Sequence, residues 1–450
     1  MSRCRPRSPS SRDHSRPFLA HGPHQRLSFP LENSQTPRMP ADPQRVVNDL
    51  KELRSLTATE QGSLRLAWTD DWVKARDWFL TTFEDTPVTQ ETDAAGNLWV
   101  TLHGASNDRI VLGSHLDSVP NGGWLDGALG VLAGAEVLRA LHRDDVELPV
   151  SISVVDWADE EGARFGRSLF GSAAVSGTLE VDAVRGLKDR SGATLEETVR
   201  NHGVNLDTVL TAGDILASIK ASAELHIEQG PVLEAKGLRL AALHAILGVE
   251  RRLVKLQGQA AHAGATPIRM RKDSTLAAAR MAVEIRQLGL DNNAFSTIGV
   301  WNVHPAVATA VNGRTEFSVD LRHLDPTVLE RMVAGLEEIV ARVAAEENVV
   351  PTMEMLWSIH PIAFDPELVE FAADAVEAHS GVREIMASGP MHDSAEMARA
   401  GVPTVMMFVP SINGLSHTHI EDTKEEHLVL GVQAFDDLVR RMIPWAARTR

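Results

Sequence analysis

Residues 109–157 constrain the fold more than any other part of the chain. Residues 109–114 (Arg-Ile-Val-Leu-Gly-Ser) predict a buried strand, residues 127–142 carry apolar side chains at helical spacing, and residues 149–157 predict a second buried strand. This order is typical of a parallel sheet, whose strands are continuous apolar runs. The segment therefore predicts an α/β fold, with a mostly parallel sheet and helices on both of its faces.

The segment from 247 to 361 has a different order of elements. It predicts strand 249–257, helix 273–288, strand 296–303, strand 314–321, helix 326–346 and strand 351–357. This order is that of a ferredoxin-like α+β unit. We expect the unit to be a second domain that is inserted in the α/β domain. The α/β domain would comprise residues 44–246 and 362–450, with further helices at 46–55, 70–84, 366–379 and 425–442 and a strand at 403–409.

Residues 1–43 are rich in Arg, Ser and Pro and have little apolar periodicity. Such a segment cannot bury enough apolar surface to offset the entropy of ordering, so we expect a disordered N-terminal extension, with Met39 as a candidate start. The extension has no apolar stretch of the secretory kind, and no run of 18 apolar residues occurs in the sequence. We therefore expect a cytoplasmic protein that does not enter a membrane.

The composition removes several classes of chemistry. The net charge of -17 argues against nucleic acid as a partner. The single cysteine lies at position 4 and there is no tyrosine, so a thiolate metal site, a core thiol nucleophile and a catalytic phenol are excluded. The common dinucleotide, phosphate-loop and serine-hydrolase motifs are missing. Any catalytic metal would have to be held by His, Asp and Glu.

Polar side chains follow several of the predicted strands. They are His115 and Asp126 after strand 109–114, Glu160 and Glu161 after strand 149–157, His226 after a short apolar segment, and His417 after strand 403–409. Ligands of open α/β sheets gather at the carboxyl ends of the strands, so these segments predict a shared metal site. Taken singly, each has a plainer interpretation, because a loop histidine or a Glu-Glu pair is usually solvated. His304, His323, His360, His419 and His427 keep that plainer interpretation, which is weakest for His419.

A series of motifs occurs in order along the chain from residue 113 to residue 421. They are Gly-Ser-His-Leu-Asp-Ser-Val with Gly-Gly-Trp-Leu-Asp-Gly (113–127), Glu-Glu-Gly-Ala-Arg-Phe-Gly (160–166), Glu-Leu-His-Ile-Glu-Gln-Gly-Pro (224–231), Ala-His-Ala-Gly-Ala-Thr-Pro (261–267), Asp-Leu-Arg (320–322), His-Asp (392–393) and Gly-Leu-Ser-His (414–417) with Glu421. In these motifs the chain resembles the metal-dependent amidohydrolases of the M20 peptidase-like family. It is most similar to the hydantoinase/carbamoylase branch, with N-carbamoyl-L-amino-acid hydrolases, β-ureidopropionases and allantoate amidohydrolases.

The resemblance implies that residues 44–246 and 362–450 form a metal-binding catalytic domain, and that residues 247–361 form an inserted lid or dimerisation domain. It also implies a binuclear metal site with two divalent ions per subunit, of zinc, manganese or cobalt. Asp126 would bridge the ions. His115 and His226 would bind one of them, and Glu161 and His417 the other. Asp117 would hold the far nitrogen of His115. Glu160 would be the general base that takes a proton from the attacking water and passes it to the leaving nitrogen.

The resemblance also implies contacts to a small ureido or carbamoyl acid substrate. Arg322 would grip its carboxylate, with Gln229 and His392 as further contacts, and His262 would reach the site from the partner subunit of a homodimer. For Arg322 an ion pair with a nearby aspartate, Asp320 or Asp325, is the alternative. His226 favours the carbamoylase branch, because related peptidases carry a carboxylate at that position.

The implied reaction is hydrolysis of the carbamoyl C–N bond of an N-carbamoyl amino acid, or of N-carbamoyl-β-alanine, to amino acid, ammonia and carbon dioxide. The alternatives are an allantoate amidohydrolase, a dipeptidase or aminoacylase of the same family, and a catalytically silent binding homologue. The chain departs from the family pattern at Asp159, often an asparagine, and in the loops 309–312 and 389–392, where Thr309 replaces a substrate-contact asparagine. These departures concern the substrate more than the reaction type.

Overall fold

The computed structural model describes residues 39–145 and 147–448. Most of the predicted N-terminal extension lies outside these ranges, but its last five residues do not behave as predicted. Ala41 is buried and donates its backbone N–H to Asp436, 3.3 Å away, and Asp42 donates to Glu136, 2.9 Å away. Asp42 also caps helix α1 (Pro43–Thr57), whose proline at the first helical position favours a helix start. The prediction of disorder up to residue 43 is therefore wrong for residues 39–43.

The largest sheet carries the strands that the sequence predicts at 109–114, 149–157 and 403–409. From one edge to the other its strands are β15 (Ile362–Ala363), β8 (Ala241–Ile246), β17 (Thr404–Val409), β7 (Ile219–Ile227), β5 (Arg109–Ser114), β6 (Ser151–Asp156), β4 (Leu98–Leu102) and β3 (Thr89–Thr92), and β16 (Ile385–Ser388) pairs with β8. The four central strands β17, β7, β5 and β6 are parallel to one another. This confirms the predicted α/β core.

The sheet as a whole is mixed, which corrects the prediction of a mostly parallel sheet. Besides the three central pairings, β16 and β8 are parallel, whereas the four pairings β3–β4, β4–β6, β8–β17 and β8–β15 are antiparallel. At the β3 edge the difference comes from a connection that contains no helix. Strands β3 and β4 are joined by a turn at residues 93–97, in which Asp93 accepts the N–H groups of Ala95 and Asn97, and so short a turn permits only antiparallel pairing.

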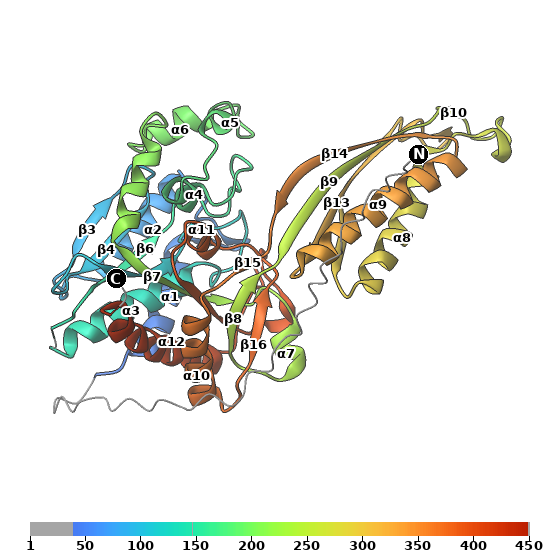
Figure 1. Cartoon of the computed structure of the whole chain (residues 1–450). Coiled ribbons are helices and arrows are strands. Elements are labelled where there is room, and N and C mark those ends of the chain that lie inside the picture. Colours follow the sequence, from blue (N-terminus) through green and yellow to red (C-terminus); the bar gives the residue numbers. More distant parts are fainter. Residues whose placement is uncertain (1–38, 146, 449–450) are drawn as a thin grey trace, which may run out of the picture. The chain divides into compact units, whose positions relative to one another are not determined.

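Helices cover both faces of this sheet, as predicted (Figure 1). On one face lie α1, α3 (Ala128–Arg143), α10 (Pro366–Ser380) and α12 (Glu425–Ala446), and on the other lie α4 (Phe170–Ser176) and α11 (Asp393–Arg399). Side chains alternate along β5. Ile110 and Leu112 enter the core between the sheet and the first set of helices, and Val111 enters the core on the opposite face, with α4 and α11. None of the helices in the described ranges is both long and apolar enough to cross a membrane.

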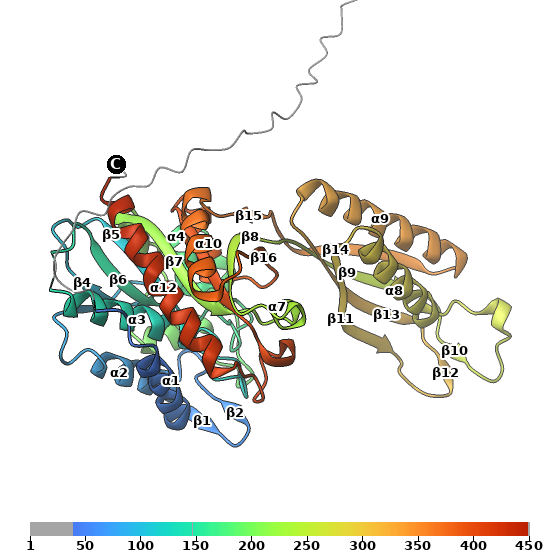
Figure 2. The same cartoon turned by 90° about the horizontal axis from the view of Figure 1, so that it is seen from below.

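Residues 248–359 form a sheet of their own, with strand order β11-β13-β9-β14 (Figure 2). Its elements are β9 (Gly248–Gln257), α8 (Ser274–Asp291), β11 (Phe295–His304), β13 (Arg314–His323), α9 (Pro326–Glu346) and β14 (Val350–Ile359). Every strand pairing in it is antiparallel, and both helices pack on the face that carries Phe317, Val319 and Leu321. The side chains of Asp320 and Arg322 alternate with these and belong to the other face.

The remaining elements are short. They are β1 (Ala58–Thr59), β2 (Gly62–Ser63), α2 (Asp70–Thr81), α5 (Val181–Arg185), α6 (Leu195–Asn201), α7 (Val232–Lys236), β10 (Ala261–His262) and β12 (Ala310–Val311), with 3-10 turns at Val209–Ser218, Ile268–Met270 and Ile412–Gly414. Each of the four loops that follow central strands contains a non-glycine residue with positive φ: Asn121 after β5, Asp159 after β6, Gln229 after β7 and His417 after β17. Such conformations cost energy and persist where the surroundings impose them, often at functional sites.

A buried ion pair supports the loop that follows β5. Arg76 of α2 donates through Nε to Asp156 at the end of β6, 2.5 Å away, and through Nη1 to the Gly96 carbonyl, 2.6 Å away. The other oxygen of Asp156 accepts the backbone N–H of Leu116 at 2.6 Å. Both charged side chains are almost fully buried. The pair therefore ties α2 and β6 to the loop that carries His115.

We expect the substitution Arg76→Gln to lower the free energy of unfolding by about 3–5 kcal/mol, because it leaves the Asp156 carboxylate buried without its counter-charge. Chemical denaturation would measure this. Arg200→Gln is the matched control, because the Arg200 side chain is 63% exposed and its pair with Glu196 lies on the surface. A surface pair contributes less than about 1 kcal/mol. Equal losses of stability in the two variants would contradict the structural role of Arg76.

Candidate metal centre

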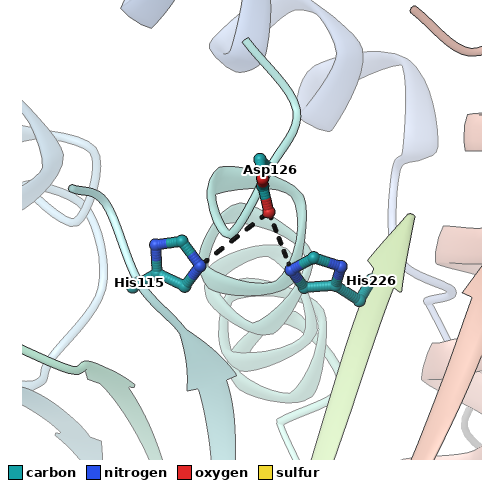
Figure 3. Close-up of side chains that lie close together, drawn as sticks. All are labelled: His115, Asp126 and His226. Atoms are coloured by element: carbon teal, nitrogen blue, oxygen red, sulfur yellow. Dashed lines mark ion pairs between the residues drawn. The ribbon is translucent and has the colours of Figure 1, made fainter. Parts of the chain in front are cut away.

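Asp126 lies between two histidines in the turn that leads into α3 (Figure 3). Its Oδ1 atom is 3.2 Å from Nε2 of His226 and 3.9 Å from Nε2 of His115. His115 follows directly after β5, and His226 is the penultimate residue of the neighbouring strand β7. All three side chains are buried. The ligand atoms of this group lie within 4.8 Å of one another, which is close enough to share one metal ion.

The second oxygen of Asp126 faces a different pair of side chains. Its Oδ2 atom is 3.3 Å from Nε2 of His417, and the same nitrogen is 3.4 Å from Oε2 of Glu161. Asp126, Glu161 and His417 thus form a second group of ligand spacing. Because one carboxylate belongs to both groups, one oxygen to each, the arrangement fits two metal ions bridged by Asp126. Imidazole and carboxylate donors suit zinc, manganese or cobalt.

The position of Asp126 is fixed by neighbours and by two glycines. Glu421 accepts the backbone N–H of Asp126 at 3.1 Å, and Gln229 donates to Oδ2 of Asp126 at 2.9 Å. A Cβ atom on Gly123 would lie 1.9 Å from the Glu421 carboxylate. Gly127 has φ +66°, and a Cβ atom there would lie 2.5 Å from the His115 ring. The motif Gly-Gly-Trp-Leu-Asp-Gly therefore needs these glycines to bring the aspartate and its histidine together.

Asp117 adjoins the far nitrogen of His115, as predicted, but mainly through its backbone. Nδ1 of His115 is 3.0 Å from the Asp117 carbonyl oxygen and 3.7 Å from the carboxylate. The carboxylate itself accepts the backbone N–H groups of Glu160 and Glu161, both at 3.2 Å. His226 likewise has its Nδ1 2.9 Å from a backbone carbonyl, that of Ile227. These contacts place the proton on Nδ1 and leave Nε2 as the ligand atom in both histidines.

Glu160 lies beside the metal groups rather than within them. Its Oε2 atom is 3.6 Å from Nε2 of His115, and the residue is 8% exposed. Burial, followed by the negative charges of Asp393 and Glu161, raises the pKa of Glu160 well above its usual value. A carboxylate in such a place accepts a proton readily, which is the property required of a general base.

The charges of the ligand set are strongly coupled. Burial opposes ionisation of Asp126, but hydrogen bonds from His226 and His417 outweigh it and hold its pKa well below the usual range. Burial lowers the pKa of His226, and Asp126 more than offsets this and raises it to about 9, while the hydrogen bond with Asp126 raises the pKa of His417 to about 9. Burial and the charge of Asp126 raise the pKa of Glu161 to about 8. The cluster thus concentrates negative charge that protons or metal cations can neutralise.

A cavity of about 850 Å³ opens onto the two metal groups and onto Glu160. Arg322, Gln229 and His392 line it, as expected of substrate contacts. Gln229 is engaged with Asp126, and the His392 ring packs against that of His226, with centroids 4.5 Å apart. These two side chains therefore also support the metal ligands directly.

Arg322 forms one of the two interactions that the sequence leaves open, the ion pair with Asp320, and keeps N–H donors for the other. Its Nε donates to Asp320 at 2.7 Å and its Nη2 at 3.3 Å, which is the strand-end ion pair. Its Nη1 donates to the Gly389 carbonyl at 2.8 Å. A guanidinium has five N–H donors, so one N–H remains on each terminal nitrogen. That pair is what a bidentate contact with a substrate carboxylate requires, so the ion pair holds Arg322 without using up its binding capacity.

His262 is not among the residues that line the cavity. It is exposed at the end of β10, where its Nδ1 accepts the backbone N–H of Gly264 at 3.1 Å. Its predicted action in a partner subunit stays a prediction. In the loop that departs from the family pattern, Asn312 accepts the backbone N–H of Ala306 at 3.0 Å, so this asparagine holds the loop.

Sequence reasoning missed several buried groups around the site. Glu224 accepts hydrogen bonds from Ser114 and Ser394, both at 2.7 Å, and forms a third group of ligand spacing with His226 and His392. The available signal was strand alternation, which places Glu224 and His226 on the same face of β7. Asp393, whose charge acts on Glu160, stands in the motif His-Asp (392–393), but no role was assigned to it because its neighbours come from distant segments.

Comparison with known proteins agrees with this geometry. Residues 111–441 match the model of the family described as Peptidase family M20/M25/M40. The chain is 35% identical to an N-carbamoyl-L-amino acid amidohydrolase of Geobacillus stearothermophilus, over 83% of this chain and 91% of that protein. It is 32% identical to an allantoate amidohydrolase of Bacillus subtilis (strain 168), over 86% and 94% of the two chains.

A solved structure is similar over nearly the whole length of both chains. The amidase of the hydantoinase/carbamoylase family from Burkholderia multivorans has a TM-score of 0.83 and 34% identity, and the match covers 92% of this chain and all of that one. The fold and most of the length of the chain thus have counterparts in proteins of one family. The chain belongs to Peptidase family M20/M25/M40.

Proposed function

We propose that this protein is a metal-dependent amidohydrolase that cleaves the carbamoyl C–N bond of an N-carbamoyl amino acid or a close ureido relative. The observation that carries the proposal is Asp126, whose two oxygens face two separate ligand groups, His115 with His226 and Glu161 with His417. The substrate class follows two similar relatives, which are named as amidohydrolases of N-carbamoyl-L-amino acids and of allantoate.

In this proposal the metal ions activate the substrate and the water, and Glu160 transfers the proton. The metal ions, when bound, polarise the carbonyl group and lower the pKa of water. Glu160 takes the proton of the attacking water, whose oxygen bonds to the carbamoyl carbon. Glu160 then delivers that proton to the amino-acid nitrogen as its bond to the carbon breaks. The carbamate that is released decomposes to ammonia and carbon dioxide, so one molecule of water is consumed per molecule of substrate.

Substrate binding would use residues 247–361 together with the metal centre, which lies in the rest of the chain. Arg322 of β13 offers its two remaining N–H groups to the substrate carboxylate. Residues 247–361 act in this proposal as a lid and dimerisation domain, and His262 reaches the site of the partner subunit in a homodimer. There it would donate a hydrogen bond to the developing oxyanion, a role typically worth roughly 3–4 kcal/mol.

Allantoate is the second candidate substrate, because the chain matches the allantoate and the carbamoyl enzymes with comparable identity. A test of the function is ammonia release by the protein supplied with manganese, cobalt or zinc. The substrates would be N-carbamoyl-α-amino acids, N-carbamoyl-β-alanine, allantoate, ureidoglycolate and, as peptidase substrates, dipeptides. We expect ammonia release from at least one ureido acid, and its loss after chelation and dialysis. Turnover of dipeptides alone, or turnover unaffected by metal removal, would contradict the proposal.

Active sites shared between subunits would be revealed by mixing variants. His262→Ala and Glu160→Gln are each expected to be nearly inactive as homodimers. In a mixed dimer, one site receives both an intact His262 and an intact Glu160, so we expect part of the activity to return on mixing. The measurement is ammonia release after subunit exchange, with exchange itself verified by mass spectrometry. Complete exchange without recovery would show that His262 does not act in the partner subunit.

A further inference from the structure

Three arginines line the cavity of the metal centre, and they are unequally neutralised. They are Arg167, Arg251 and Arg322. Asp320 accepts hydrogen bonds from Arg251 and from Arg322, in each case at 2.7 Å. These two cations therefore share the negative charge of one carboxylate. One unit of positive charge remains on this pair, which a single substrate carboxylate would balance.

Arg167 has no such partner. It lies in the loop after Glu161, and its one hydrogen bond within the described residues runs from Nη1 to the Ser168 carbonyl, 2.9 Å away. Glu396 is the acid whose charge acts most on it, but that carboxylate is bound by Ser176, Thr178 and Arg399 at 2.5 to 2.7 Å. Burial lowers the pKa of Arg167, so its guanidinium is partly withdrawn from water without an ion-pair partner among these residues.

Arg167 is half-buried beside the cavity and has no ion-pair partner among the described residues, so its guanidinium is available to bind an anionic group of a ligand. Four of its five N–H donors have no partner in the described chain, and neither Nε nor Nη2 is closed off from the cavity or solvent. The same cavity is lined by Leu356 and Trp357, whose apolar surfaces suit methylene groups. The cavity therefore has charge for two anions and an apolar surface for the carbon chain that joins them.

We propose that Arg167 binds a second carboxylate of the substrate, and that the preferred substrates are N-carbamoyl amino acids with an acidic side chain, such as N-carbamoyl-L-aspartate and N-carbamoyl-L-glutamate. This inference rests on the proposed function, in which Arg322 holds the α-carboxylate. The hydrolysis is unchanged: water adds to the carbamoyl carbon, the bond to the amino-acid nitrogen breaks, and an acidic amino acid, ammonia and carbon dioxide result.

The test compares each acidic substrate with its neutral amide, which has nearly the same size. For N-carbamoyl-L-glutamate against N-carbamoyl-L-glutamine, and for the aspartate and asparagine pair, we expect kcat/KM to favour the acid. In Arg167→Gln the ratio of acid to amide should fall by about 10- to 100-fold, as expected for loss of a charged hydrogen bond. Arg167→Lys should retain part of the preference. Arg190→Gln is the matched control, because Arg190 is exposed and does not line the cavity, and it should leave the ratio unchanged.

Two outcomes would overturn the inference: no preference for the acids in the wild-type protein, or a ratio that is the same in Arg167→Gln. Calorimetric binding of L-glutamate and L-glutamine separates this inference from the proposed function, because it needs no turnover. Tighter binding of glutamate that is lost in Arg167→Gln supports the second anion site even if no carbamoyl compound is hydrolysed. If carbamoyl substrates are hydrolysed but neither kcat/KM nor binding distinguishes the acid from its amide, the proposed function is supported and the second anion site is rejected.

Discussion

Replacing Glu160 by glutamine is expected to lower kcat by about a thousand-fold while leaving the metal content of the protein unchanged. General acid–base catalysis typically contributes 10²- to 10⁴-fold, and the amide has no basic oxygen that can accept the proton of water. Glutamine has nearly the same shape, and Glu160 belongs to neither of the groups of ligand spacing around Asp126. Turnover would be measured by ammonia release and metal content by elemental analysis of the purified protein.

Because Glu160 is buried, the effect of its substitution on turnover can be distinguished from an effect on metal content or on stability. Burial and the neighbouring acids raise its pKa, so a neutral amide should fit this position without loss of stability. Glu338→Gln on the surface of α9 is the matched control, and we expect it to change neither turnover nor metal content. If Glu160→Gln kept turnover within ten-fold of the wild type, another group would be the base. If the metal were lost, Glu160 would be a ligand instead.

The centre of the fold could be predicted from the sequence because its strands are buried on both sides. Strand 109–114 and helix 326–346 coincide with β5 and α9. The missed strands lie toward the edges. Residues 89–92 (Thr-Gln-Glu-Thr) are all exposed in β3 and have no apolar pattern, and residues 241–246 in β8 are rich in alanine, a poor strand former. Their strand structure comes from pairing with neighbours, which no local pattern encodes.

The metal groups could be predicted because their members follow parallel strands. The carboxyl ends of β5, β7 and β17 are adjacent, so His115, His226 and His417 had to approach one another once the strands were identified. The surrounding contacts were not predictable in this way. That Asp117 binds the backbone of Glu160, and that Arg167 lacks an ion-pair partner, depend on loop conformations and on side chains from distant segments. Such contacts are decided by packing and not by spacing along the chain.

Asp126→Asn should have the largest effect on metal binding of any single substitution, because one residue serves both groups. An asparagine side chain has one oxygen and one NH₂ group, and the NH₂ group has no lone pair to offer a cation. One of the two positions, facing either His226 or His417, must therefore lose its donor. We expect the metal content to fall from two ions per chain to one or none. We expect activity to fall by more than about 100-fold, the upper range for residues that only support a ligand.

Gln229, which contacts Asp126 but belongs to neither ligand group around it, offers a comparison with Asp126→Asn. Gln229→Ala removes a hydrogen bond to Oδ2 of Asp126 but leaves both carboxylate oxygens in place. Its effect on metal affinity should therefore stay within about 10- to 100-fold, as for other supporting contacts, and both ions should still bind at saturating metal. Asp77→Asn on the exposed face of α2 controls for the loss of one negative charge. An Asp126→Asn variant that still bound two ions with wild-type affinity would rule out a bridging carboxylate, and the two ligand groups would then have to be independent sites.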